Sequence, residues 1–148
     1  MIYFVDSNFL PVPGGDAYAT INDINKIMTN VPAWEINNYV QKTGLIIAAT
    51  KKIDVGLRYI GSKLDPVQPL QFPRKINQIA TWVDPVDNIL SPQGQAEILI
   101  YCVALQVEYD LFRAPIGQVN YSRGDISETP IQTTLARGVK IRLMPYRQ

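Results

Sequence analysis

The stretch that decides the fold is Ala33–Arg74, AWEINNYVQKTGLIIAATKKIDVGLRYIGSKLDPVQPLQFPR. Its first half predicts a helix from about Ala33 to Leu57, because apolar residues recur there at helical spacing. These residues are Ile46, Ala49, Ile53, Leu57 and Ile60. The second half is rich in proline and closes on Phe72-Pro73-Arg74. Neither half offers catalytic chemistry, so the stretch favours a protein that fits against other molecules.

The proline-rich part predicts a long loop over residues 61–90. Five of the eleven prolines lie between Gly61 and Pro92. A loop of this length in a compact domain is usually either functional or disordered. Its many apolar residues argue against disorder. We therefore expect an ordered loop that packs partly on its own helices and partly on a partner, with Phe72 at least partly outside the core.

Two more helices are expected, one before this stretch and one after it. Asp16 is placed to cap a first helix that Asn30 and Pro32 stop. Ser91-Pro92 is a cap followed by proline, which predicts the start of a third helix that runs to about Phe112. Its apolar stripe is expected to comprise Ile98, Tyr101, Cys102, Leu105, Tyr109 and Phe112.

The end of the chain is harder to interpret. Pro115 and Gly117 are expected to end the third helix and to begin an extended arm over residues 116–130. Thr129-Pro130 then predicts a last helix, which Gly138 weakens. The predicted fold class is mainly α: a small bundle of three to four helices in a single domain, 1–148. Within it we expect a helical core (16–112), the long loop (61–90), the arm and a basic C-terminal segment (131–148).

Charge is close to balanced, with 14 basic and 13 acidic residues and a net charge of +1. This balance argues against a strong electrostatic grip on nucleic acid by the whole domain. The segment 131–148 is the exception, because it contains Arg137, Lys140, Arg142 and Arg147 and no acidic residue. These cations either complement a helix dipole or bind an acidic surface or DNA.

The residue inventory disfavours catalysis. The chain has no histidine and a single cysteine, Cys102, and it contains no glycine-rich phosphate loop. We therefore expect no enzyme activity, no cofactor and no metal site. We interpret Cys102 as a buried small hydrophobe. No run is apolar enough to cross a membrane and no signal peptide is recognisable, so we expect work in a reducing cytoplasm or in a particle assembled there.

Aromatic and basic residues supply the candidate interface. Most aromatic residues on predicted helices fall on or beside core stripes, and they do not alternate with basic residues along any one element. Core packing is therefore the preferred interpretation for most of them, rather than stacking on single-stranded bases. The residues that we expect at interfaces are Phe72, Pro73, Arg74, Trp82, Tyr121, Arg137, Lys140, Arg142 and Tyr146.

The order of motifs resembles a family of tailed-bacteriophage head–tail adaptor proteins, some of which carry the label "putative DnaT-like single-stranded DNA-binding protein". The resemblance covers residues 16–74 well and the last helix loosely. This chain departs from the family's pattern over residues 76–90 and at Gly138. The matching residues are Asp16-Ala17-Tyr18, Ala33-Trp34, Leu45, Ala48-Ala49-Thr50, Ile53-Asp54, Gly61, Pro66, Gln68, Phe72-Pro73-Arg74 and Leu143-Met144-Pro145-Tyr146.

This resemblance implies a structural protein of the virion, assembled in the host cytoplasm and located at the head–tail junction. It implies a homo-oligomeric ring, a dodecamer matching the portal, with the portal protein and tail-side neck proteins as partners. DNA would pass through the ring without sequence-specific contacts. The alternative is a single-stranded DNA-binding protein, for which a salt-sensitive affinity for oligonucleotides is expected.

Overall fold

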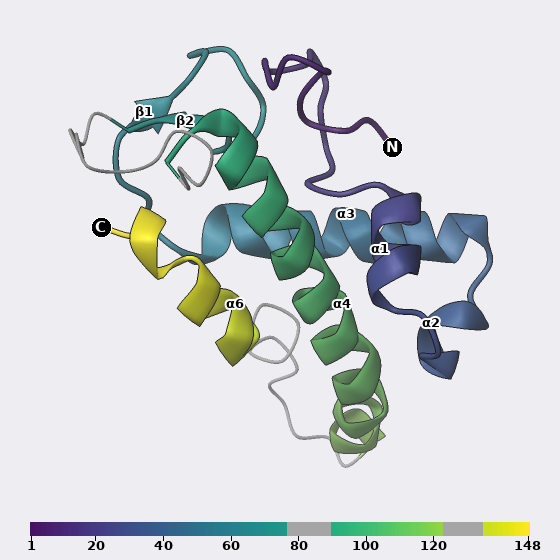
Figure 1. Cartoon of the computed structure of the whole chain (residues 1–148). Coiled ribbons are helices and arrows are strands. Elements are labelled where there is room, and N and C mark those ends of the chain that lie inside the picture. The colour runs from purple at the N-terminus through teal and green to yellow at the C-terminus, as the bar shows by residue number, and fades with distance from the viewer. Residues whose placement is uncertain (77–89, 123–134) are drawn as a thin grey trace.

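The computed structural model describes residues 1–76, 90–122 and 135–148. The described part is mainly helical, which confirms the predicted fold class (Figure 1). A short antiparallel pair of two-residue strands, β1 and β2, lies beside the helices. None of the described helices has the length and apolar character needed to span a bilayer. The elements are α1 (Ile21–Ile27), α2 (Pro32–Glu35), α3 (Tyr39–Gly56), β1 (Ser62–Lys63), β2 (Arg74–Lys75), α4 (Pro92–Ser122), α6 (Arg137–Arg142) and the 3-10 helix η1 (Met144–Tyr146).

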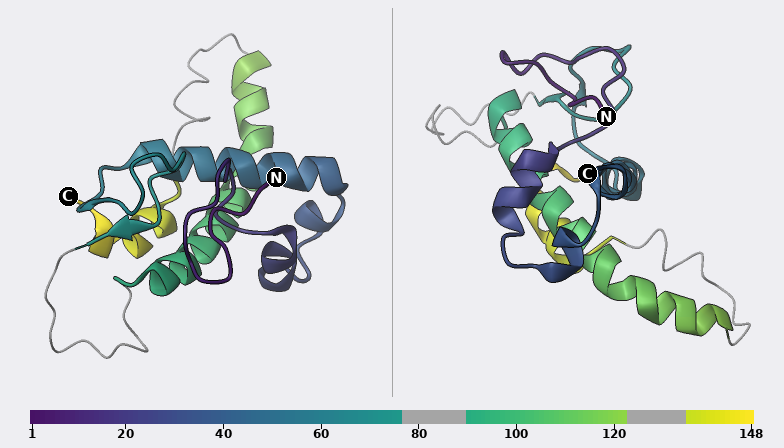
Figure 2. Two further views of the ribbon diagram at one scale, coloured as in Figure 1. Left: turned by 90° about the horizontal axis from the view of Figure 1, so that it is seen from above. Right: turned by 90° about the vertical axis from the view of Figure 1, so that its right-hand side faces the viewer.

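Helix α4 is the centre of the molecule. It crosses α3, contacts α1 and α2 along one side, and contacts α6 along the other. Its C-terminal part extends beyond α3, away from the strands (Figures 1 and 2). The core therefore lies where α4 meets its four neighbours.

The first helix begins later than the sequence pattern predicts. Thr20, not Asp16, is the N-cap of α1, and it forms a reciprocal capping box with Asp23. The carboxylate of Asp16 instead accepts a 2.7 Å hydrogen bond from the backbone nitrogen of Ile2. Asp16 thus ties down the N-terminal strand-like segment, a contact that spacing along the chain does not reveal.

The predicted helix over residues 33–57 is in fact two helices. It breaks after α2, and Asn38 caps α3 through a second capping box with Gln41. Asn37 donates from its side-chain amide to the backbone oxygen of Ala33 at 2.7 Å. Asparagine side chains compete in this way for backbone partners, which explains why a helix ends and another begins at these positions. The core face of α3 is as predicted, because Ile46, Ala49 and Ile53 are buried.

The described part of the predicted loop, residues 61–76, packs on the helices. It folds back on itself where β1 pairs with β2. Gly61 makes the entry turn with a φ of +75°, a conformation that residues with a Cβ rarely adopt. Residues 77–89, which include Trp82, lie outside the described residues.

Helix α4 starts where the sequence predicts but ends later. Ser91 caps it by accepting a 3.1 Å hydrogen bond from the backbone nitrogen of Gly94. The helix continues through Pro115 to Ser122, so the predicted end near Phe112 is wrong, and so is the extended conformation predicted for residues 116–122. A proline inside a helix removes one hydrogen bond, but it need not stop a helix that is already formed. The rest of the predicted arm, residues 123–130, lies outside the described residues.

The stripe predicted for this helix is also rotated relative to the true core face. Leu99, Val103 and Val107 are fully buried, whereas Tyr101 is 50% exposed and Phe112 is 57% exposed. The burial of Cys102, with an exposed fraction of 0%, is as predicted. Because α4 is covered on several sides, its buried face follows its neighbours rather than its largest aromatic residues.

The predicted start of the last helix, at Thr129-Pro130, lies outside the described residues. Within the described residues, α6 begins at Arg137, after Ala136, and ends at Arg142. Val139 and Leu143 bury one face of this segment against α4. Gly138 does not interrupt the helix. A Cβ at Gly138 would come within 3.2 Å of Leu105 Cδ1, so glycine is the residue that permits this close approach of α6 to α4.

Candidate functional site

Four of the predicted interface residues are buried in the chain's own core. Phe72 is 1% exposed, and its ring packs edge to face against Tyr18, Tyr59 and Tyr146. Tyr146 is itself fully buried. Aromatic rings in this arrangement stabilise a core beyond their buried area. The expectation that Phe72 lies partly outside the core is therefore wrong, and Tyr146 is likewise a core residue.

Arg74 and the adjacent Pro73 are also buried, and the guanidinium of Arg74 is used internally. Its Nε donates to the backbone oxygen of Ile60 at 2.7 Å, and its Nη2 donates to that of Gly61 at 2.8 Å. Burial lowers the pKa of Arg74 from its ordinary value. The Phe72-Pro73-Arg74 motif thus closes the loop onto the helices rather than presenting it to a partner.

Two further candidates are not placed by the structure. Trp82 lies outside the described residues. Tyr121 belongs to the last turn of α4, but nothing is described of its side chain. Their roles at an interface stay predictions.

The remaining three candidates form a cationic surface on the last segment. Arg137, Lys140 and Arg142 are exposed, as is Arg147. Val139 of the same helix is buried against α4. With no acidic side chain in residues 135–148, this segment presents positive charge alone.

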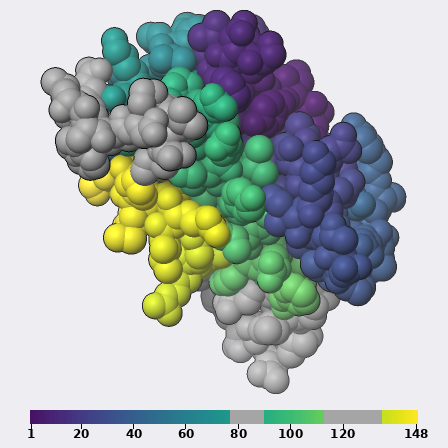
Figure 3. Space-filling view, in the orientation of Figure 1, coloured from purple at the N-terminus to yellow at the C-terminus, as the bar shows by residue number. Residues whose placement is uncertain are grey.

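The tertiary structure places exposed aromatic rings beside these cations. The guanidinium carbon of Arg142 lies 5.4 Å from the centroid of the Tyr101 ring on α4, a cation–π contact. Phe112 is exposed farther along the same helix. In the space-filling view, the C-terminal segment and α4 lie side by side on one face (Figure 3). We name this face, formed by Tyr101 and Phe112 of α4 and the cations of residues 137–147, the α4–α6 face.

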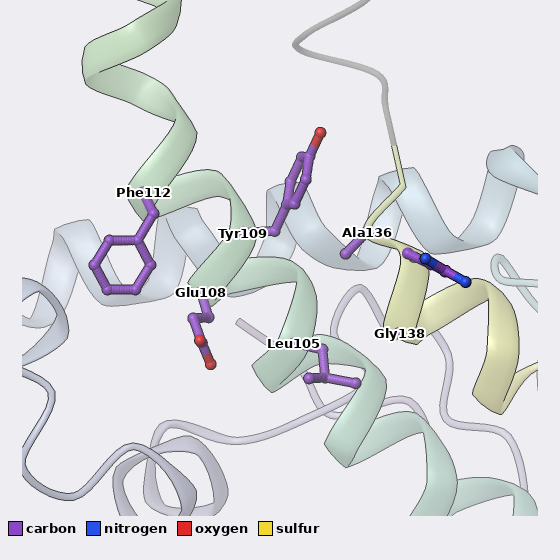
Figure 4. Close-up of a pocket in the computed structure, with 7 residues that line it drawn as sticks. Leu105, Glu108, Tyr109, Phe112, Ala136 and Gly138 are labelled. Carbon is purple, nitrogen blue, oxygen red and sulfur yellow. The ribbon is translucent and has the colours of Figure 1, made fainter.

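A hollow opens in the α4–α6 face. Its volume is about 360 Å³, which is at the small end of the range of ligand pockets. Helix α4 forms one wall, and residues at the start of α6 form the other (Figure 4). The lining residues are Leu105, Glu108, Tyr109, Phe112, Ala136, Arg137 and Gly138. Among the described residues the walls are mostly apolar, with one carboxylate, Glu108, and one guanidinium, Arg137.

A chain of polar contacts, buried at Gln106 and partly buried at Asp110 and Lys52, fixes the position of α6 against α4. The side-chain oxygen of Gln106 accepts a 2.8 Å hydrogen bond from the backbone nitrogen of Ala136. Its Nε2 donates to Asp110 at 2.9 Å, and Asp110 pairs with Lys52 of α3 at 2.9 Å. Hydrogen bonds to buried partners restrict geometry more tightly than apolar contact does. The start of α6, and with it the hollow, is therefore held in place from α3 through α4.

The face offers binding chemistry rather than reactive chemistry. Cys102 lies beneath it, but burial raises the pKa of this thiol to about 12, so it stays protonated near neutral pH. Among the described residues, no cluster of histidine, cysteine or acidic side chains could hold a metal ion. Cations beside exposed aromatic rings are the groups that bind phosphates and stack on unpaired bases.

The α4–α6 face cannot be found from the sequence patterns, because each pattern describes one segment and not the contacts between segments. Tyr101 was assigned to a core stripe, and Arg142 was assigned to a basic segment far along the chain. No signal in either segment shows that they meet. The exposed position of Tyr101 could have been found only by knowing which neighbours cover α4.

Comparison with known proteins finds one family. The family model described as "Putative DnaT-like ssDNA binding protein" matches residues 5–115, which is most of the chain and includes the aromatic side of the face. No curated protein and no solved structure matches the chain.

Proposed function

The chain belongs to the DnaT-like ssDNA-binding family, and from this premise we propose that it binds single-stranded DNA along the α4–α6 face. The observation that carries the proposal is the juxtaposition of exposed cations of α6 with exposed rings of α4: Arg142 lies over the Tyr101 ring, and Arg137 lines the same hollow as Phe112. The phosphates would lie along Arg137, Lys140 and Arg142. Unpaired bases would stack on the aromatic rings, as they do in other proteins that bind single strands.

The Arg142–Tyr101 contact suits this role. A guanidinium over a ring is held in one orientation, yet its outer N–H groups can still donate to phosphate oxygens. Stacking on aromatic rings tolerates any base, because every base has a π-face. The expected binding is therefore largely independent of sequence along most of the face.

The balance of charge limits the strength of binding. The net charge is only +1, so attraction comes from the local cations and not from the whole protein. Counterion release gives a slope of about −0.7 in log K against log salt for each single-strand phosphate contacted. With three or four contacts, the affinity falls by roughly 20- to 50-fold between about 50 and 200 mM salt.

Fluorescence anisotropy with a labelled oligo-dT tests this proposal. Lys140→Ala and Arg142→Ala are each expected to weaken binding and to reduce the salt slope by about 0.7. Lys51→Ala is the matched control, because Lys51 is an exposed cation on α3, outside the face. Equal effects of all three variants, or the absence of salt-sensitive binding by the native protein, would overturn the proposal.

We propose as the second candidate the head–tail adaptor role that the sequence motifs imply. The observation that favours it is an exposed apolar corner where α2 meets α3. Ile36 is 82% exposed, Tyr39 is 71% and Val40 is 75%. Adjacent large apolar side chains in such exposed positions favour contact with another protein. A homo-oligomeric ring on the portal, with DNA in its channel, would cover this corner and use the cations of α6 toward DNA.

Sedimentation of the protein alone and with purified portal protein tests the second candidate. Val40→Asp is expected to weaken ring formation and portal binding, whereas Lys51→Ala is expected to leave both unchanged. A native protein that stays monomeric at high concentration and does not sediment with the portal protein would exclude the adaptor role.

A further inference from the structure

We propose that the hollow in the α4–α6 face receives one unpaired base and that Glu108 makes it prefer bases that carry an exocyclic amino group. This inference rests on the proposed single-stranded DNA binding and adds a specificity that stacking alone does not give. It concerns only the base in the hollow, not the bases stacked elsewhere on the face.

The shape and lining of the hollow suit a planar, partly polar group. Leu105, Tyr109, Phe112 and Ala136 supply apolar surface on both walls. The start of α6 approaches α4 closely at Gly138, where a side chain would press on Leu105. A base that enters would bury its faces against these walls and leave its edge to meet the polar lining residues.

The carboxylate of Glu108 determines which base edge forms hydrogen bonds in the hollow. It is the single carboxylate among the lining residues that the structure describes. An ionised carboxylate can only accept hydrogen bonds. Cytosine, adenine and guanine each present an amino group that donates, whereas thymine presents carbonyl oxygens, which a carboxylate repels, and only a ring N–H to donate. The carboxylate therefore favours amino-bearing bases over thymine.

Arg137 supplies the complementary charge at the same hollow. It is exposed, stands at the start of α6 and lines the hollow together with the α4 residues. A phosphate attached to the bound nucleotide can lie near this guanidinium while the base edge meets Glu108. The opposite charges of the two side chains thus match the two ends of one nucleotide, its phosphate and its donor edge.

The test compares labelled oligo-dC and oligo-dT at neutral pH, in the native protein and in two variants. Glu108→Gln keeps the size of the side chain but adds an amide donor that suits the carbonyl oxygens of thymine. Glu97→Gln is the matched control, since Glu97 is also an exposed carboxylate on α4, next to Tyr101 and outside the hollow. Both variants remove one negative charge. Any general increase in affinity for the negatively charged oligonucleotide therefore appears in both.

The native protein is expected to bind oligo-dC more tightly than oligo-dT by roughly three- to tenfold, the ratio that one hydrogen bond supplies. Glu108→Gln is expected to bring this ratio to about one, and Glu97→Gln to leave it unchanged. A native ratio near one with clear salt-sensitive binding would overturn this inference while leaving the proposed function intact. An equal change of the ratio in both variants would overturn it as well. A lack of binding to either oligonucleotide would remove the proposed function and this inference together.

Discussion

The side chain of Gln106 holds the backbone of Ala136, with 2.8 Å between Oε1 and the amide nitrogen. Gln106 is fully buried in α4, and Ala136 immediately precedes α6. One hydrogen bond therefore sets where the basic helix begins relative to the aromatic rings of α4.

Gln106→Leu should lower the free energy of unfolding by about 1–3 kcal/mol, because it leaves the buried amide of Ala136 without an acceptor. It should also weaken oligonucleotide binding, since α6 loses its fixed position. Urea unfolding and anisotropy measure the two effects. Gln93→Leu is the control, because Gln93 is exposed on the same helix, and its change in stability should stay within about 0.5 kcal/mol. Equal stabilities of the two variants would contradict a structural role for the Gln106 amide.

Phe72→Ala should destabilise the chain itself by about 3–5 kcal/mol, because it empties the centre of a fully buried aromatic cluster. Phe112→Ala removes an equally large ring from an exposed position, so its cost should be far smaller. Thermal unfolding compares the two. If Phe72→Ala instead kept the stability of the native protein and lost only self-association, Phe72 would act at an interface between subunits and not in the core.

Gly44→Ala and Gly61→Ala should shift stability in opposite directions. A Cβ at Gly44 meets no described atom within 4 Å, so alanine should stabilise α3 by about 0.5–1 kcal/mol. At Gly61 the backbone has a φ of +75° and a Cβ would collide with the backbone oxygen of Lys75, so alanine should destabilise by more than about 1 kcal/mol. The measurement is the urea concentration at the unfolding midpoint of each variant relative to the native protein. A shift of both midpoints in the same direction would be inconsistent with these backbone environments.

Asp54 should make stability depend on pH. It accepts hydrogen bonds from the hydroxyl of Tyr18 and, at 2.7 Å, from the backbone nitrogen of Gln71. Burial nevertheless raises its pKa above the ordinary 3.8. A folded-state pKa above the unfolded value means that the contribution of this group is fully present below about 3.8 and is lost as pH rises through the folded-state pKa.

The measurement is the difference in unfolding free energy between the native protein and Asp54→Asn. Asparagine keeps an acceptor oxygen but cannot ionise, so effects of the other carboxylates cancel in the difference. The native protein should gain stability relative to the variant as pH is lowered from about 7 to about 4. A relative loss over this range would show that the hydrogen bonds to Asp54 outweigh its burial.

Several features of the fold can be predicted from the sequence because they depend on neighbours along the chain. Ser91-Pro92 favours a helix start, since a serine hydroxyl at the N-cap accepts from an amide three residues on, as it does here from Gly94. The spacing of Ile46, Ala49 and Ile53 fixes one face of α3, and that face is buried. The mainly helical class follows from such local signals.

Other features were misjudged because their signals compete. Asn37 and Asn38 could belong to a helix by spacing, but their side chains bond to nearby backbone groups and separate α2 from α3. Pro115 looked like a helix end, yet α4 continues past it. In each case two local preferences act in opposite directions, and spacing along the chain does not show which of them prevails.

The sequence by itself determined the helical character, the Ser91 cap at the start of α4 and the concentration of cations in the last segment. Only the tertiary structure decided that Phe72 and Tyr146 belong to the core and that Arg142 meets Tyr101 on an exposed face. The physical reason is the distance along the chain over which each kind of interaction acts. Capping bonds and helical periodicity act over a few residues, whereas burial and cation–π contact depend on which distant segments the folded chain brings together.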